Sequence, residues 1–236
     1  WHGIFRKGAE NKVVVYFFGG GVSITPETSE GGKEFYATTM LAQDFVAQGG
    51  IGSSAEDNPF KDWSFIVIPY ATGDFHAGTA IYEGEKAVYH TGYNNYSAFV
   101  EQIKPHVGEP DTLLVTGFSA GGFATSLLAD DVIDRFPSAG NVTVCVDSSL
   151  LLYDGWHDTA VDLWRTPSEI SDRLTTDNLV LDSLIALYEK RGDSVKILFD
   201  CSYRDDTLMQ YQSYIDTGKI CLLYTSDAAD ERSSVD

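Results

Sequence analysis

Five short runs of apolar, largely β-branched residues recur along the chain, separated by segments whose apolar residues follow a helical spacing. The runs cover residues 13–18, 65–68, 112–115, 142–146 and 195–199. Strands that are buried on both faces read as continuous apolar runs, and parallel strands are joined by crossover helices. The sequence therefore predicts an α/β fold with a mostly parallel central sheet and helices on both faces. Since no internal repeat or low-complexity linker interrupts this order, we predict a single domain over residues 1–220.

Helical segments are predicted for residues 33–46, 96–103, 123–136 and 181–188, with a loop over residues 48–62. The third helix carries an apolar stripe of Phe123, Leu127, Leu128, Val132 and Phe136. The fourth carries a stripe of Leu181, Leu184, Ile185 and Tyr188. Such stripes are typical of the core-facing side of a helix, and Pro137 marks the end of the third.

The charge of the chain excludes some classes of function. There are 16 Lys and Arg against 35 Asp and Glu, a formal net charge of −19. Because such a surface repels phosphate backbones, we expect no nucleic-acid partner. No stretch approaches the ~20 apolar residues of a membrane helix, so we expect no membrane span. The oligomeric state stays open.

The three cysteines do not form a recognisable framework. Cys145, Cys201 and Cys221 are too few for a disulfide scaffold and lack Cys-x-x-Cys spacing. We therefore expect no metal site and interpret the cysteines as buried apolar side chains.

Gly117-Phe118-Ser119-Ala120-Gly121 is a G-x-S-x-G motif placed between a predicted strand and a predicted helix. In this context the motif is typical of a nucleophile elbow, a tight turn that lifts the serine hydroxyl to the N-terminus of a helix. We therefore predict that Ser119 is a catalytic nucleophile. The alternative is a serine that caps the helix, followed by glycines needed for packing.

Acyl transfer also needs hydrogen-bond donors aimed at the developing oxyanion. The backbone amide of Ala120 supplies one donor, and a second is expected from the glycine triplet after the first strand, with Gly20 and Gly21 as candidates. A plain flexible turn is the alternative. A dinucleotide-binding loop is disfavoured because the G-x-G-x-x-G spacing fails at Ile24 and no Gly-Lys-Ser/Thr occurs.

Several motifs in the same order resemble the pectin acetylesterase and Notum-like carboxylesterases. They are Phe18-Gly19-Gly20-Gly21, Asn58-Pro59-Phe60, Ile68-Pro69-Tyr70-Ala71-Thr72-Gly73-Asp74, Ala77-Gly78 and Ser119-Ala120-Gly121-Gly122. The resemblance extends from about residue 10 to about residue 215. It implies an α/β-hydrolase fold, a Ser-Asp-His triad, hydrolysis of carboxylic esters and a secreted or extracellular protein. The esters are often acetyl groups on plant cell-wall polysaccharide. Many members carry Cys where this chain has Ser23 and Ala71, so any disulfide using those positions is gone.

By the same resemblance, the triad acid is Asp205, with Asp206 beside it as an alternative. The acid would hold the imidazole tautomer and stabilise the imidazolium. Both aspartates also suit the cap of a helix beginning near Thr207. Asp147, at the end of the fourth strand, is a further candidate for the acid.

The triad base is missing from its expected place. The chain order Ser, Asp, His puts the base after Asp205, and all five histidines precede it. They are His2, His76, His90, His106 and His157. Near Asp74, His76 is interpreted as a pocket or loop-bracing residue, with a substrate contact or a surrogate base as alternatives. His90 and His157 are interpreted as surface or structural residues.

The end of the chain offers an explanation. Residues 221–231 resemble the translation of a transposon-based sequencing adapter, and we interpret residues 221–236 as a non-native tail. The alternative is a genuine polar tail. On the first interpretation the hydrolase domain is incomplete at its C-terminus, and the opening on Trp1 indicates the same for the N-terminus. A chain without the triad His is expected to hydrolyse esters at background rates.

The sequence thus predicts a serine esterase that needs no metal or organic cofactor and removes acetyl groups from a polysaccharide through an acyl-enzyme. The substrate is an acylated carbohydrate or a small ester. The acidity of the chain disfavours a polyanionic galacturonan unless Lys and Arg residues form a local basic groove. Two alternatives stay open. One is an inactive glycan-binding protein on a hydrolase scaffold, and the other is a Notum-like lipid deacylase.

Overall fold

The computed structural model describes residues 1–47 and 49–218. The chain forms two compact units, Trp1–Cys201 and Ser202–Asp236. The first unit contains every strand of the described residues. The single domain predicted over residues 1–220 stays a prediction.

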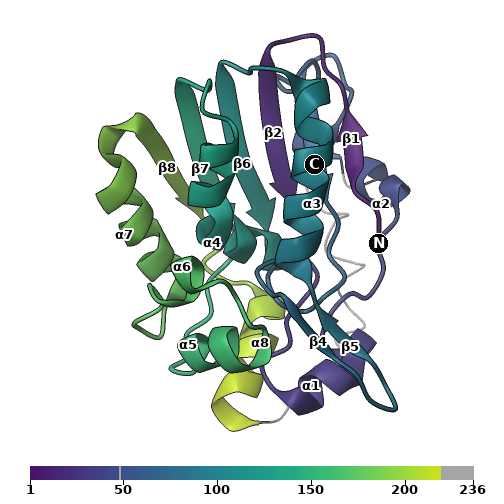
Figure 1. Ribbon diagram of the computed structural model, residues 1–236, viewed down its shortest axis with the longest axis vertical. Helices are drawn as coiled ribbons and strands as arrows, with labels where there is room; N and C mark the ends of the chain where they lie inside the picture. The colour runs from purple at the N-terminus through teal and green to yellow at the C-terminus, as the bar shows by residue number, and fades with distance from the viewer. Residues whose placement is uncertain (48, 219–236) are drawn as a thin grey trace, which may run out of the picture. The chain divides into compact units, whose positions relative to one another are not determined.

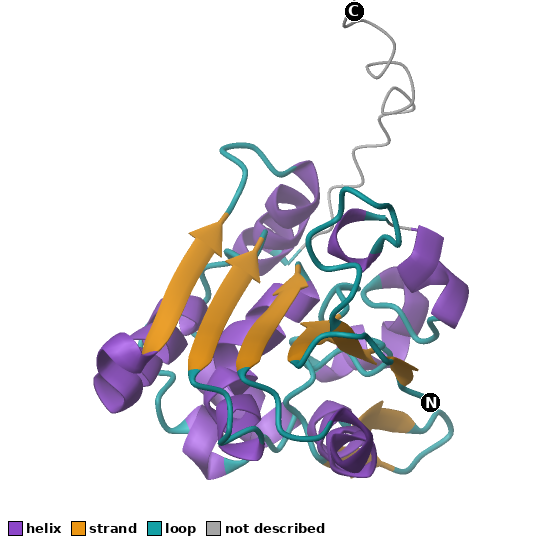
Figure 2. Cartoon of the chain, turned by 90° about the horizontal axis from the view of Figure 1, so that it is seen from above, coloured by secondary structure: helices purple, strands orange, loops and turns teal. Residues whose placement is uncertain are grey.

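A six-stranded sheet of order β1-β3-β2-β6-β7-β8 forms the centre of the first unit. Its strands are β1 (Ile4–Arg6), β2 (Lys12–Phe17), β3 (Ser64–Ile68), β6 (Thr112–Phe118), β7 (Asn141–Asp147) and β8 (Val195–Asp200). Only the β1–β3 pair is antiparallel. Figure 2 shows the longest strands as neighbouring orange arrows that point the same way. The predicted mostly parallel sheet is confirmed.

Helices cover both faces of this sheet. The helices α3 (Gly92–Val107), α4 (Ala120–Arg135) and α7 (Leu179–Arg191) lie on the face toward the viewer in Figure 1. The ring of Phe17 contacts Tyr96 of α3, whereas the rings of its neighbours Tyr16 and Phe18 contact Phe45 of α2 (Ala42–Ala47). Since successive side chains of a strand point to opposite faces, α2 lies on the other face.

Short elements gather beyond the carboxyl ends of the parallel strands, at the lower end of the ribbon in Figure 1. They are α1 (Pro26–Gly31), the 3₁₀ turn η1 (Gly32–Glu34), the hairpin of β4 (Ala80–Tyr82) and β5 (Val88–His90), α5 (Trp156–Asp158), the π-helix η3 (Thr159–Leu163) and α6 (Ser168–Ser171), whereas the 3₁₀ turn η2 (Gly50–Gly52) follows α2. Buried aromatic rings join several of them to α4. Phe75 stacks on Phe123 at 4.3 Å, and Trp156 and Trp164 pack around Phe75.

The remaining elements are the 3₁₀ turn η4 (Gly192–Ser194) and, in the second unit, α8 (Asp206–Thr217). Asp205 is the N-cap of α8, and its carboxylate accepts a hydrogen bond of 2.9 Å from the amide of Leu208. The predicted adapter-derived tail, residues 221–236, lies outside the described residues.

The single helix predicted over residues 33–46 is wrong. The segment is divided between η1, an extended stretch and α2. Gly32 has φ of 55°, and the backbone beyond it pairs with the glycine triplet, where the amide of Ala37 donates to the carbonyl of Gly20. In this pairing, backbone N–H and C=O groups bond to the glycine triplet. They are therefore not available for the internal hydrogen bonds of a continuous helix.

The apolar stripe predicted on α7 does not face the core. Leu181, Ile185 and Tyr188 are 51%, 48% and 57% exposed, whereas Leu179, Val180 and Leu187 of the same helix are buried. Because apolar residues occur on more than one side of α7, spacing alone selected the wrong side. Cys145 and Cys201 are half-buried rather than buried, and Cys221 lies outside the described residues.

Candidate active site

Ser119 occupies a strained turn between β6 and α4. Its φ is 52° and its ψ −127°, a conformation that costs a non-glycine residue about 1–3 kcal/mol. A Cβ atom on Gly117 or Gly121 would overlap the backbone of Phe17, so the turn needs glycine at both positions. The G-x-S-x-G motif therefore forms the predicted elbow, with Ser119 directly before the first residue of α4.

The elbow is held from the neighbouring strand. The amide of Ser119 donates a hydrogen bond of 3.1 Å to the carbonyl of Asp147, the last residue of β7. The hydroxyl of Ser149, which is fully buried, lies 2.7 Å from the carbonyl oxygens of both Ser119 and Asp147. Sequence reasoning missed Ser149, because a single serine carries no pattern that shows which backbone groups it will contact.

The glycine triplet lies against Ser119. A Cβ atom on Gly19 would stand 3.1 Å from the Cβ atom of Ser119. Gly21 has φ of 82°, which favours glycine. Among residues 1–47 and 49–218, the amides of Gly20 and Gly21 donate no hydrogen bond. The amide of Ala120, in the first turn of α4, is one that helix geometry leaves without an internal partner. Unused donors at these positions suit an oxyanion hole.

His76 lies beneath the triplet and is 2% exposed. Its Nε2 donates a hydrogen bond of 2.9 Å to the carbonyl of Phe18, and its ring packs on Phe17 and Tyr70. Burial lowers the pKa of His76 to about 4, although the bond to Phe18 and the charge of Asp74 oppose the shift. The imidazole is therefore neutral near pH 7 and ties the end of β2 in place.

Asp74 is fully buried and organises the loop around His76. Its carboxylate accepts hydrogen bonds from the hydroxyl of Thr72 at 2.6 Å, the amide of Gly92 at 2.8 Å and the amide of His76 at 3.1 Å. Three such bonds satisfy a buried carboxylate without a countercharge.

Asp147 and Asp200 are register partners at the ends of β7 and β8. Both line a cavity of about 430 Å³ that also contacts Tyr16 and Phe118. Burial and the charge of Asp147 raise the pKa of Tyr16 to about 12. Asp147 is therefore close to the elbow, and Asp200 is a second carboxylate there that sequence reasoning missed.

Asp205 and Asp206 belong to the second unit. Asp205 caps α8 as described above, and Asp206 forms an ion pair of 2.9 Å with Arg204. Their assignment as triad acids stays a prediction.

The other histidines have separate positions. His90 is fully buried, where Nδ1 donates to the carbonyl of Thr72 at 2.7 Å and Nε2 lies 2.9 Å from the hydroxyl of Ser29. His2, His106 and His157 are exposed. Within the described part of the chain, no histidine nitrogen forms a hydrogen bond with the Ser119 hydroxyl.

A family model described as Pectinacetylesterase matches residues 3–160, which include the elbow and the glycine triplet. The chain belongs to the pectinacetylesterase family. This membership supports carboxylic ester hydrolysis as the type of activity. No curated protein matches the chain.

The fold is similar to that of a solved structure, the Wnt deacylase Notum from Drosophila. The TM-score is 0.63 and the sequence identity 18%, over 89% of this chain and 68% of that one. At this identity the likeness is one of fold, and it confirms the predicted α/β-hydrolase architecture. Over residues 1–47 and 49–218, no helix is long and apolar enough to span a membrane, and no group of three His, Cys, Asp or Glu side chains is placed to hold a metal ion.

Proposed function

We propose that this protein is a serine esterase that removes acetyl groups from a polysaccharide through an acyl-enzyme. The observation that carries the proposal is the strained Ser119 at the end of β6, with Gly19 packed against it. A conformation of this cost persists where the surrounding structure holds it, and such residues cluster at active sites.

Ser119 Oγ attacks the carbonyl carbon of the ester, and a base accepts the hydroxyl proton. The amides of Ala120 and of Gly20 or Gly21 stabilise the negative charge on the carbonyl oxygen, and each such donor typically contributes about 3–4 kcal/mol. The C–O bond to the sugar then breaks, and the sugar oxygen takes the proton. Water hydrolyses the acyl-serine, which releases acetate and restores Ser119.

The acid of the triad is proposed to be Asp205, with Asp206 and Asp147 as alternatives. The bond between the Ser119 amide and the Asp147 carbonyl supports a position for Asp147 near the reaction centre. The capping role of Asp205 does not conflict with a triad role, because a carboxylate has two oxygens and accepts more than one hydrogen bond.

A second candidate is a glycan-binding protein without turnover. It is favoured by one observation, that no histidine of the described residues forms a hydrogen bond with the Ser119 hydroxyl. A serine without a base keeps only the residual catalysis of substrate binding and the oxyanion hole.

Chemical rescue with free imidazole distinguishes the two candidate functions. Free imidazole can act as the base if Ser119 and the oxyanion hole are competent. We expect p-nitrophenyl acetate hydrolysis at background rates without imidazole. With imidazole, a Ser119-dependent rate should rise by roughly tenfold or more, because general bases contribute about 10²–10⁴-fold when positioned.

Imidazole itself cleaves this ester, so the rate of Ser119→Ala in the same buffer is subtracted. Ser126→Ala is the matched control, since Ser126 is a buried serine of α4 whose hydroxyl bonds the carbonyl of Phe123. Equal rates for the wild type and Ser119→Ala at every imidazole concentration would reject the esterase proposal. Rapid Ser119-dependent hydrolysis without imidazole would identify an internal base, with His76 as the first residue to substitute.

A further inference from the structure

A second cavity, of about 500 Å³, lies apart from the one beside Asp147. Its walls come from α1 and the loop before it, the β4–β5 hairpin, and the segment of α5 and η3. All three lie beyond the carboxyl ends of the strands in Figure 1, the end of the sheet that also carries Ser119. A cavity of this volume is in the range of small-molecule sites.

Two of its walls continue the segments that contact the nucleophile. Ile24 follows Gly21 by three residues, and Tyr153 follows Ser149 by four. Four residues span at most about 14 Å, so the Cα atom of Tyr153 lies within about 14 Å of that of Ser149, whose hydroxyl contacts the Ser119 carbonyl. The site is therefore placed to hold a part of the substrate beyond the reacting ester.

Hydrogen bonds fix the walls to one another. The indole of Trp164 donates to the carbonyl of Ser23 at 2.9 Å, next to Ile24. The hydroxyl of Tyr82 lies 2.9 Å from the carbonyl of Asp162 and 2.8 Å from that of Leu163, which ties the hairpin to η3. The cavity is thus a preformed feature of the first unit.

The lining combines apolar surface with acceptors of hydrogen bonds. Aliphatic and tyrosine side chains supply most of it, from Ile24, Pro26, Val88, Leu163, Tyr82 and Tyr153. The acidic residues Glu30, Asp158 and Asp162 also line the cavity, and all three are exposed to solvent. Such surfaces pack against the C–H face of a sugar ring and against acetyl methyl groups, while carboxylates accept hydrogen bonds from sugar hydroxyls.

The charge around the cavity is negative. No Lys or Arg of the described residues lines it. Arg165 stacks on the ring of Tyr82 at 5.2 Å but is not one of the lining residues. A uronate would bring its carboxylate toward three others without a lining cation to receive it, which costs binding energy.

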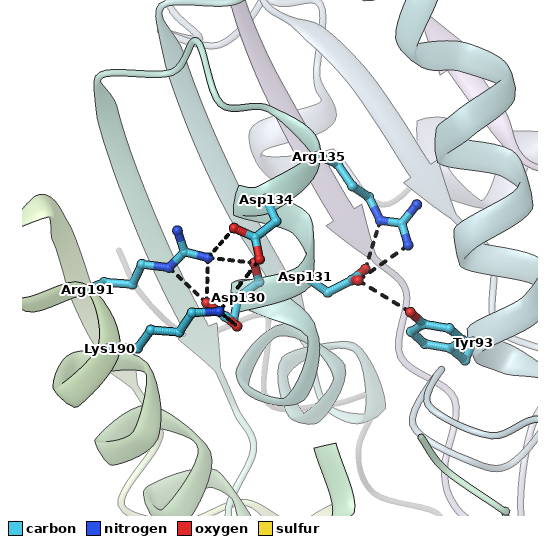
Figure 3. A network of polar contacts seen from close by, with 7 residues as sticks. All are labelled: Tyr93, Asp130, Asp131, Asp134, Arg135, Lys190 and Arg191. Atoms are coloured by element: carbon cyan, nitrogen blue, oxygen red, sulfur yellow. Dashed lines mark hydrogen bonds and ion pairs between the residues drawn. The ribbon is translucent and has the colours of Figure 1, made fainter. Parts of the chain in front are cut away.

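Six of the basic residues lie at the opposite end of the sheet, where strands begin and helices end. These are Lys12, Lys104, Arg135, Lys190, Arg191 and Lys196. Several are paired there with acids of α4, as in the bonds of Arg135 to Asp131 and of Lys190 to Asp130 (Figure 3). At physiological salt a charge is screened beyond about 8 Å, so these cations do not offset the carboxylates of the cavity.

We propose that the cavity of Ile24, Tyr82, Tyr153 and Asp162 binds an uncharged, O-acetylated sugar residue, so that the protein selects neutral acetylated glycans over acetylated galacturonan. The inference rests on the proposed function for its choice of sugar chemistry, and it concerns the alcohol part of the substrate.

Binding is measured by isothermal titration calorimetry on the whole chain, with three probes. They are an acetylated xylo-oligosaccharide, an acetylated oligogalacturonide of equal length, and decanoate as an acyl-chain probe. The neutral oligosaccharide should bind at least tenfold more tightly than the uronide, and Tyr153→Ala should weaken its binding at least tenfold. The double variant Glu30→Lys with Asp162→Lys should gain uronide binding that declines between 50 and 500 mM salt.

Glu109→Lys makes one such acid-to-lysine change at the opposite end of the sheet and should leave all three affinities unchanged. Circular dichroism on each variant confirms folding. Equal or tighter binding of the uronide, no loss in Tyr153→Ala, or binding of decanoate in place of the sugar would each overturn the proposal. Hydrolysis of p-nitrophenyl acetate does not need this cavity, so failure of imidazole rescue rejects the esterase proposal and failure of sugar binding rejects this one.

Discussion

The hydroxyl of Ser149 lies 2.7 Å from the carbonyl oxygen of Ser119. The same hydroxyl lies 2.7 Å from the carbonyl of Asp147, which accepts the Ser119 amide hydrogen bond. Ser149 therefore joins the end of β7 to the elbow. One buried side chain thus contacts the carbonyl of Ser119 and the carbonyl that accepts the Ser119 amide hydrogen bond.

Ser149→Ala should loosen the elbow and lower stability. Loss of a buried hydrogen bond costs about 1–2 kcal/mol, which in a chain of this length lowers Tm by roughly 2–8 °C. The imidazole-dependent, Ser119-dependent rate should fall further than stability alone explains. Ser126→Ala, which loses a comparable buried bond, should lower Tm without changing that rate. An equal effect of both variants on the rate would contradict a positioning role for Ser149.

Gly121→Ala should be severely destabilising. A Cβ atom there would overlap the carbonyl of Phe17, which is backbone and has no rotamer to change. Such overlap belongs among the backbone and overpacking effects that exceed about 3 kcal/mol. Gly140→Ala is the control, because nothing lies within 4 Å of its Cβ position. Urea denaturation should show a large loss for the first variant and a change within about 0.5 kcal/mol for the second, and similar midpoints would contradict the packing of β2 against α4.

The elbow was predictable because its signals are local. A strand, a G-x-S-x-G turn and a helix stand next to one another in the chain, and the structure gives Ser119 the positive φ that this turn needs. Ser149 and Asp200 were not predictable in this way. Their contacts with the site depend on which strands become neighbours in the sheet. A single serine or aspartate does not show in the sequence which strands those will be.

The sheet was predictable for a related reason. Strands buried on both faces, such as β3, leave continuous apolar runs. The segment around η1 and α2 was not, because its backbone bonds to the glycine triplet rather than to itself, as in the bridge of Gly21 and Tyr36. Tertiary pairing there outweighs the local helical pattern.

The buried His76 should make stability depend on pH. Its folded pKa of about 4 lies below the ordinary value of 6.5, so the unfolded chain binds a proton first as the pH falls. Above pH 6.5 both states are neutral and the group has no effect. Between about pH 6.5 and 4 the free energy of unfolding falls, by up to about 3 kcal/mol, and below pH 4 this contribution is constant.

Urea denaturation of the wild type and His76→Gln between pH 4 and 7 tests this. The glutamine amide can donate to the Phe18 carbonyl but does not titrate, so the difference between the two proteins should change across this window. A constant difference would show that His76 keeps an ordinary pKa and is not buried as described.

Two leucines of α7 test which side of that helix packs. Leu187 is 1% exposed and Leu181 is 51% exposed, and both are interior residues of the same helix with the same propensity. Leu187→Ala should cost about 2–5 kcal/mol through lost burial and a cavity, whereas Leu181→Ala should stay within about 0.5 kcal/mol. The measurement is the urea midpoint of each variant at constant m-value. Equal losses of unfolding free energy would mean that the exposed side of α7 is covered in solution. A larger loss for Leu181→Ala would show that the stripe predicted from the sequence does face the core.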